Sequence, residues 1–122
     1  MAVLPDFLIK RIYKKGSLRF DAGAIEFDLK NVLGPGAICG FEYVQINGHK
    51  FSKDATYFIT QNIKQLANCV SELNPIHFRL GQECTFRLEE GINCIKEGLN
   101  QIEIELTNPE AGKLKVLFED NL

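Results

Sequence analysis

The chain has 122 residues, of which 45% are hydrophobic and 25% charged, and its formal net charge is −2. This length and balance predict a single domain over residues 1–122 that buries a core without metal or disulfide staples, and they exclude a disordered chain. A net charge so near zero also argues against a nucleic-acid partner bound through its phosphates.

The N-terminal residues show no targeting signal. Residues 1–8 lack a basic region followed by a long apolar stretch, so they do not predict a signal peptide. No apolar run in the chain approaches the roughly 18 residues that suggest a membrane span. The sequence therefore predicts a cytoplasmic protein with no membrane partner.

Period-two alternation of apolar and polar residues dominates the first half of the chain and is typical of half-buried strands. It starts at residues 17–20 and is clearest at residues 25–30. After a Gly-Pro-Gly loop at residues 34–36, the segment 37–46 changes phase between Tyr43 and Val44, which predicts either a bulge or a strand covered on both faces. Asn47-Gly48 then predicts a type I′ hairpin turn, because both central residues of that turn need φ above zero.

The segment from residue 56 to residue 73 allows two interpretations after its start. Residues 56–60 form a β-branched and aromatic run typical of a strand. Beyond them, apolar residues at three- and four-residue spacing suit a short helix near residues 62–73, which Asn62 could cap. Its weak capping and few strong helix formers leave a strand as the alternative.

Alternation returns after Pro75 and continues to residue 118. It marks strands over residues 76–80, 84–88, 102–106 and 114–118, the last two joined as a hairpin by a turn at residues 108–112. The total is about eight strands. Because each apolar sheet face needs a partner, the sequence predicts an all-β fold, an antiparallel two-sheet β-sandwich of jelly-roll type.

Four cysteines are spread along the chain, at Cys39, Cys69, Cys84 and Cys94. Without a CxxC pair they do not predict a zinc site. Two disulfides are arithmetically possible, but the missing secretory signal favours free thiols.

No catalytic, cofactor-binding or metal-binding residue is assigned from the sequence. His49 and His77 are candidates for a general base or a metal ligand, but neither lies in a motif, so we expect both on the surface. A pair of carboxylates could perform acid–base chemistry on a glycoside, but on alternating strands we expect them on the solvated faces. They are Glu26, Asp28, Glu42, Glu89, Glu90, Glu103 and Glu105.

Two further groups of residues have a binding interpretation and a structural one. The basic residues Lys10, Arg11, Lys14, Lys15 and Arg19 suit either an anion site or, as we favour, the solvated face of a strand. The aromatic residues Phe41, Tyr43, Tyr57 and Phe58 suit either a sugar platform or, as we favour, the core, because the chain has no Trp.

Several short motifs resemble one known family. They are Leu29-Lys30-Asn31-Val32, Gly34-Pro35-Gly36, Gly40-Phe41, Val44-Gln45-Ile46-Asn47-Gly48, residues 76–81 and residues 98–104. Together, over residues 25–122, they resemble the small β subunits associated with bacterial C-glycoside deglycosidases. The resemblance implies an intracellular β-sandwich paired with a larger TIM-barrel subunit, which holds the catalytic metal and catalytic residues. No functional residue of that family maps onto this chain.

Three functions follow as hypotheses. The first is a non-catalytic accessory subunit, which predicts a larger protein partner or a homo-oligomer covering an exposed apolar patch. The second is a free-standing carbohydrate-binding module, which predicts exposed aromatic residues in a row. The third is a small enzyme, which predicts a pocket where His49 or His77 meets a carboxylate or a cysteine.

Overall fold

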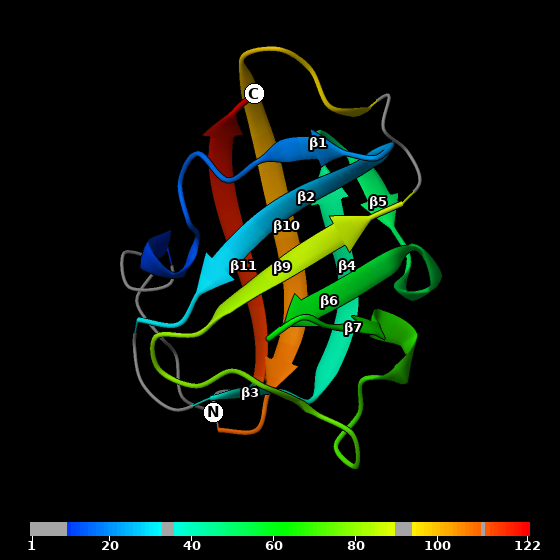
Figure 1. The fold of residues 1–122 in the computed structure, drawn as a ribbon, viewed down its shortest axis with the longest axis vertical. Coiled ribbons are helices and arrows are strands. Elements are labelled where there is room, and N and C mark those ends of the chain that lie inside the picture. Colours follow the sequence, from blue (N-terminus) through cyan, green and yellow to red (C-terminus); the bar gives the residue numbers. More distant parts are fainter. Residues whose placement is uncertain (1–9, 33–35, 90–93, 111) are drawn as a thin grey trace.

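The computed structural model describes residues 10–32, 36–89, 94–110 and 112–122 (Figure 1). This part of the chain forms eleven strands and no α-helix. The strands are β1 (Arg19–Asp21), β2 (Ala24–Lys30), β3 (Ala37–Ile38), β4 (Gly40–Ile46), β5 (His49–Phe51), β6 (Thr56–Thr60), β7 (Ile63–Leu66), β8 (Ile76–His77), β9 (Glu83–Leu88), β10 (Leu99–Asn108) and β11 (Gly112–Asn121). Short 3-10 turns include η1 (Lys10–Ile12), η2 (Lys53–Ala55) and η3 (Ala67–Cys69).

The strands form two main antiparallel sheets. One has the order β1-β2-β9-β6-β7, the other has the order β11-β10-β4-β5, and β3 pairs with β8 separately. The five-stranded sheet crosses in front of the four-stranded sheet in Figure 1. The predicted all-β, antiparallel two-sheet architecture is confirmed, with eleven described strands in place of about eight. The additional strands have two to four residues, too few to show alternation in a sequence.

A series of phenylalanine rings joins the two sheets. Phe27 on β2 stacks on Phe86 of β9, with ring centroids 5.1 Å apart. Phe86 meets Phe58 of β6 at 4.7 Å, and Phe58 meets Phe41 of β4 edge-on at 5.2 Å. All four rings are at most 2% exposed. Because Phe41 belongs to the four-stranded sheet and the others to the five-stranded sheet, these contacts form the centre of the sandwich core.

The helix suggested for residues 62–73 is wrong. Residues 63–66 are β7, which pairs with β6, and Ala67–Cys69 is only a 3-10 turn. Gln61 and Asn62 have φ angles of 50° and 65° and make the tight turn between the two strands. Ile63 is 65% exposed and Leu73 is 98% exposed, so the helical spacing of apolar residues does not mark a buried face.

Two local predictions for the first half of the chain are confirmed. Asn47 and Gly48 have φ angles of 50° and 89°, as the type I′ turn between β4 and β5 requires. The change of phase in β4 is a bulge. Phe41 pairs with Leu106 and Tyr43 with Glu105, so Glu42 is the extra residue and Phe41 points to the core with Val44.

Some predicted features lie outside the described residues. They are residues 1–8, Gly34-Pro35 of the predicted loop, Glu90 among the carboxylates, and Ala111 in the turn between β10 and β11. Within the described ranges, no helix is long and apolar enough to cross a bilayer.

Candidate functional site

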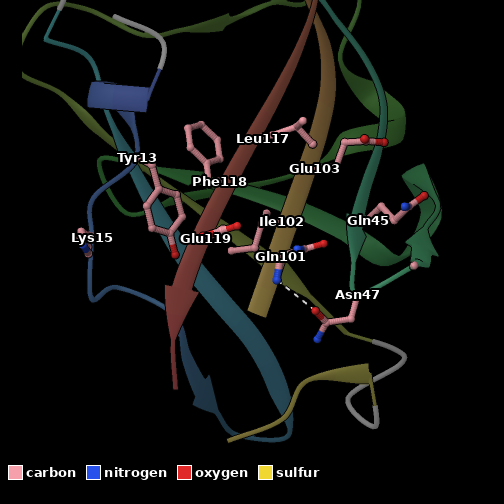
Figure 2. Close-up of a pocket in the computed structure, with 11 residues that line it drawn as sticks. Tyr13, Lys15, Gln45, Asn47, Gln101, Ile102, Glu103, Leu117, Phe118 and Glu119 are labelled. Atoms are coloured by element: carbon pink, nitrogen blue, oxygen red, sulfur yellow. Dashed lines mark hydrogen bonds between the residues drawn. The ribbon is translucent and has the colours of Figure 1, made fainter. Parts of the chain in front are cut away.

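A hollow of about 590 Å³ lies on the four-stranded sheet, over β4, β10 and β11 (Figure 2). Its lining includes side chains that point away from the core, because outward and inward residues alternate along each strand. Ile102 and Ile104 of β10 are fully buried, whereas Gln101 and Glu103 beside them face the hollow. The outward lining residues are Gln45, Gln101, Glu103, Leu117 and Glu119, with Lys15 at the margin.

Glu103 is already engaged inside this hollow. The hydroxyl of Tyr43 donates a 2.6 Å hydrogen bond to Glu103 Oε2, and Lys115 Nζ lies 3.9 Å from Glu103 Oε1. Lys50 Nζ lies 4.5 Å from the centre of the Tyr43 ring. The hydrogen bond to Glu103 raises the pKa of Tyr43, since losing the proton would place two negative oxygens together. Tyr43 therefore stays neutral and donates to Glu103 at neutral pH.

Asn47 also has its polar atoms occupied. Its amide group donates to the backbone oxygen of Cys94 and to Asn100 Oδ1, both at 2.8 Å. Its Oδ1 accepts the backbone N–H of Gln101 at 3.0 Å, the dashed line in Figure 2. These bonds hold the turn after β4 against β10. Asn47 thus shapes one side of the hollow rather than offering groups to a ligand.

Four other side chains of the hollow have unused hydrogen-bonding groups. Within the described part of the chain, the side chains of Lys15, Gln45, Gln101 and Glu119 make no hydrogen bond or ion pair that would occupy them. Beside them lies Leu117, which is 59% exposed. Amides, an ammonium, a carboxylate and an exposed leucine are groups that bind another molecule. None of them is a nucleophile activated by a neighbouring base.

Beneath the margin of the hollow, a buried carboxylate anchors the segment that carries Lys15. Asp120 accepts hydrogen bonds from the Tyr13 hydroxyl at 2.7 Å, from Gly16 N–H at 3.0 Å and from Leu18 N–H at 3.2 Å. Burial, followed by the hydrogen bond to Asp120, raises the pKa of Tyr13. The segment 13–18 is therefore fixed against β11.

Comparison with known proteins assigns the family. A family model described as hydroxymethylglutaryl-CoA reductase, N-terminal domain, matches residues 8–122. The chain belongs to this family. A search of curated proteins finds no significant match.

The resemblance to small β subunits of C-glycoside deglycosidases is wrong, because the chain belongs to the reductase N-terminal domain family. The match runs through all the motifs on which that resemblance rests, which are mostly turns and core positions. Such positions serve any antiparallel sandwich, because every sandwich needs tight turns and alternating core residues. The expected link to carbohydrate metabolism has no support from the reductase family model.

The histidines lie on the surface of this family member, as predicted. His49 on β5 contacts the ring of Phe51, and His77 on β8 pairs with Ala37 in the separate two-stranded sheet. The imidazole of neither histidine makes a hydrogen bond or ion pair with another residue of the described ranges. Those ranges also contain no group of three His, Cys, Asp or Glu side chains arranged to hold a metal ion.

Two of the carboxylates expected on solvated faces are buried. Glu26 and Asp28 on β2 are 7% and 9% exposed. Asp28 receives two hydrogen bonds from Arg19 and one of 2.7 Å from Thr85, while Glu26 lies 2.8 Å from Arg87 and 3.1 Å from Arg19. Guanidinium groups on the neighbouring strands cover these carboxylates. Each of the two carboxylates is thus paired with at least one guanidinium group, as in a structural ion-pair network.

The predicted basic group does not come together as one site. Arg19 pairs with Glu26 and Asp28, and Lys14 donates to Glu83 at 2.9 Å. Among the described side chains of this group, only Lys15 borders the hollow.

The predicted aromatic group is divided as well. Phe41 and Phe58 are core residues, as expected. Tyr43 and Tyr57 point outward from different sheets, so they do not form one platform.

All four cysteines are free thiols. Burial raises the pKa of Cys84 to about 12, so this thiol stays protonated at neutral pH.

Sequence reasoning missed the hollow itself. Gln45 and Gln101 carry no motif, and their meeting depends on the pairing of β4 with β10. One signal existed in β11, where Leu117 occupies the outward phase between Lys115 and Glu119. An apolar residue at an outward position is the kind of signal that marks a contact surface.

Proposed function

We propose that this chain is a non-catalytic accessory domain that pairs with a larger protein chain through the hollow on the four-stranded sheet. The observation that carries the proposal is the set of unengaged amide groups of Gln45 and Gln101 beside the exposed Leu117. Amides donate and accept at once, so they suit the backbone and polar side chains of a protein surface.

The family supports this role through its name, which is that of one domain of a larger enzyme. A hydroxymethylglutaryl-CoA reductase chain from the same organism is therefore the first partner to test. In this proposal, catalysis belongs to the partner. The proposed location is the cytoplasm, which agrees with four free cysteines, since disulfides are rare there.

The test begins with purification of the protein under mild conditions from its own host, with native mass spectrometry of the complex. A larger chain in a fixed ratio, which re-binds the purified domain, is the expected result. Recovery of the domain without any such chain would overturn the proposal.

A variant then locates the contact. Gln45→Ala combined with Gln101→Ala should weaken binding of the identified chain by about tenfold or more, because partner groups lose their hydrogen bonds. The matched control is Lys53→Ala combined with Glu72→Ala, two exposed residues outside the hollow. Equal affinities for the two double variants would exclude the hollow as the contact surface.

A further inference from the structure

The edge strand β11 differs from the other strand edges of the two main sheets. β1, β5 and β7, which end the sheets elsewhere, have three or four residues each. β11 has ten residues and pairs with β10 in an unbroken register from Leu99↔Asn121 to Asn108↔Gly112. It contains no proline and no bulge. Long regular edges of this kind are templates for a further strand, whereas short or bulged edges are protected.

The backbone groups on the free side of β11 can be assigned from the register. Leu122 N–H donates to the oxygen of Gly98, and hydrogen-bonded pairs alternate along an antiparallel ladder. Even-numbered residues of β11 therefore direct their N–H and C=O groups at β10. Lys113, Lys115, Leu117 and Glu119 direct theirs away from the sheet, and no hydrogen bond to them comes from the rest of the described chain.

Among the described residues, segment 13–18 lies beside β11 without pairing with its free edge. Tyr13 bridges to Leu29 of β2, and Lys14 N–H donates to the oxygen of Asp28, so residues 13 and 14 extend the edge of the five-stranded sheet. The ring of Tyr13 contacts Phe118, the N–H of Gly16 donates to Asp120, and the side chains of Phe118 and Asp120 both face the core. The hollow borders the edge at Leu117 and Glu119 (Figure 2).

The outward side chains of β11 are self-complementary. In an antiparallel pair of two copies with the two-fold axis at Leu117, each Lys115 faces Glu119 of the other copy, and the two Leu117 side chains face each other. Lys113 then faces the neutral Asn121. Centring the axis on Lys115 or on Glu119 would instead place like charges opposite each other, which destabilises cross-strand pairs. Lysines at an edge strand normally discourage pairing with another strand. Here the charge of Lys115 is neutralised by Glu119 of the other copy, which lies opposite it.

We propose that two copies of this chain associate through their β11 edges, centred on Leu117, so that the two four-stranded sheets become one continuous sheet. Main-chain hydrogen bonds supply the attraction and the Lys115–Glu119 pairs select the register. The association does not rest on the accessory role. Leu117 belongs to both surfaces, but the test below measures only self-association of the purified chain, so the dimer can fail while binding of a larger chain through Gln45 and Gln101 holds.

Sedimentation velocity on the purified chain, from about 1 μM to about 1 mM, measures the association. Wild type should form a dimer, and Lys115→Glu and Glu119→Lys should each raise the dimer Kd at least about tenfold, because two attractive pairs become repulsive. An equimolar mixture of the two variants should recover the dimer, since every 115–119 pair is again of opposite charge. Lys113→Glu, the matched control on the same strand, should leave the dimer Kd within about twofold, because it faces Asn121.

The substituted side chains are exposed, so the melting temperature of each variant should stay close to that of wild type. A wild-type monomer at every concentration would overturn the proposal. So would a dimer that survives both single charge reversals, or folded variants whose mixture stays monomeric.

Discussion

At the scale of single residues, Asp120 shows how one side chain can join distant parts of the chain. It is 2% exposed and accepts hydrogen bonds from Tyr13, Gly16 and Leu18. Several donors aimed at one carboxylate satisfy a charge that would otherwise be costly to bury. The contact between β11 and the segment 13–18 therefore depends on this residue.

The first prediction concerns Tyr13→Phe. The change leaves the ring in the core and removes one hydrogen bond to a buried charged acceptor, so the free energy of unfolding should fall by about 1–3 kcal/mol. Urea unfolding at neutral pH measures this loss. Unchanged stability would contradict the importance of the Tyr13–Asp120 bond.

The first prediction extends to alkaline pH, where Tyr13 determines part of the change in stability. Burial and Asp120 raise its pKa above the ordinary value of 10.0, so the folded chain holds this proton more tightly than the unfolded chain. Its contribution is complete below pH 10.0 and is lost as pH rises further, so Tyr13→Phe should show a shallower alkaline decline. The alkaline decline of Tyr43→Phe is measured in parallel, because Tyr43 is a second tyrosine whose pKa is raised, in its case by the hydrogen bond to Glu103. Identical declines in wild type and Tyr13→Phe would contradict the assignment.

The residue scale also limits what sequence can predict. Burial of Ile25, Phe27 and Leu29 follows from alternation and is confirmed. Burial of Glu26 and Asp28 on the same strand does not follow, because it depends on Arg19 and Arg87 from the strands on either side. A pattern within one strand contains no information about which side chains cover its outer face.

At the scale of elements, the hairpin turns show which local signals can be trusted. Asn47-Gly48 was predictable because its residues alone satisfy a turn with two positive φ angles. Gln61-Asn62 makes the same kind of turn without glycine, so its signal is weak. The helical spacing of neighbouring apolar residues then favoured the wrong structure.

The second prediction follows from that turn. Gln61→Asn combined with Asn62→Gly should raise the free energy of unfolding by about 0.5–1 kcal/mol, because the new pair adopts positive φ with less strain. Chemical denaturation measures the difference. Gln61→Ala, which keeps the strained φ, should not stabilise the protein, and a gain of stability in that variant would contradict the explanation.

At the scale of the whole molecule, the layers were predictable and the strand order was not. Alternation requires two packed sheets, whichever strands pair. The order depends on pairings such as β2 with β9 and β4 with β10, which join segments far apart in the sequence. The hollow depends on the second of these pairings, and for that reason no candidate site could be assigned beforehand.

The third prediction tests the aromatic centre of the core. Phe58→Ala should lower the free energy of unfolding by about 3–5 kcal/mol, because the cavity would separate Phe41 of one sheet from Phe86 of the other. Tyr57→Ala is the matched control, since this neighbour faces outward under Lys64 and should cost only about 1 kcal/mol. Similar losses for the two variants would contradict the central role of Phe58.

The bond between Tyr13 and Asp120 spans 107 positions in the chain. During synthesis, the N-terminal partner emerges from the ribosome long before its acceptor exists. The segment 13–18 can bridge to β2 early, but it lacks its contacts with Asp120 until β11 has been made. Closure of that side of the sandwich is consequently a late event in the life of each new molecule, and a chain interrupted before residue 120 would be unable to complete it.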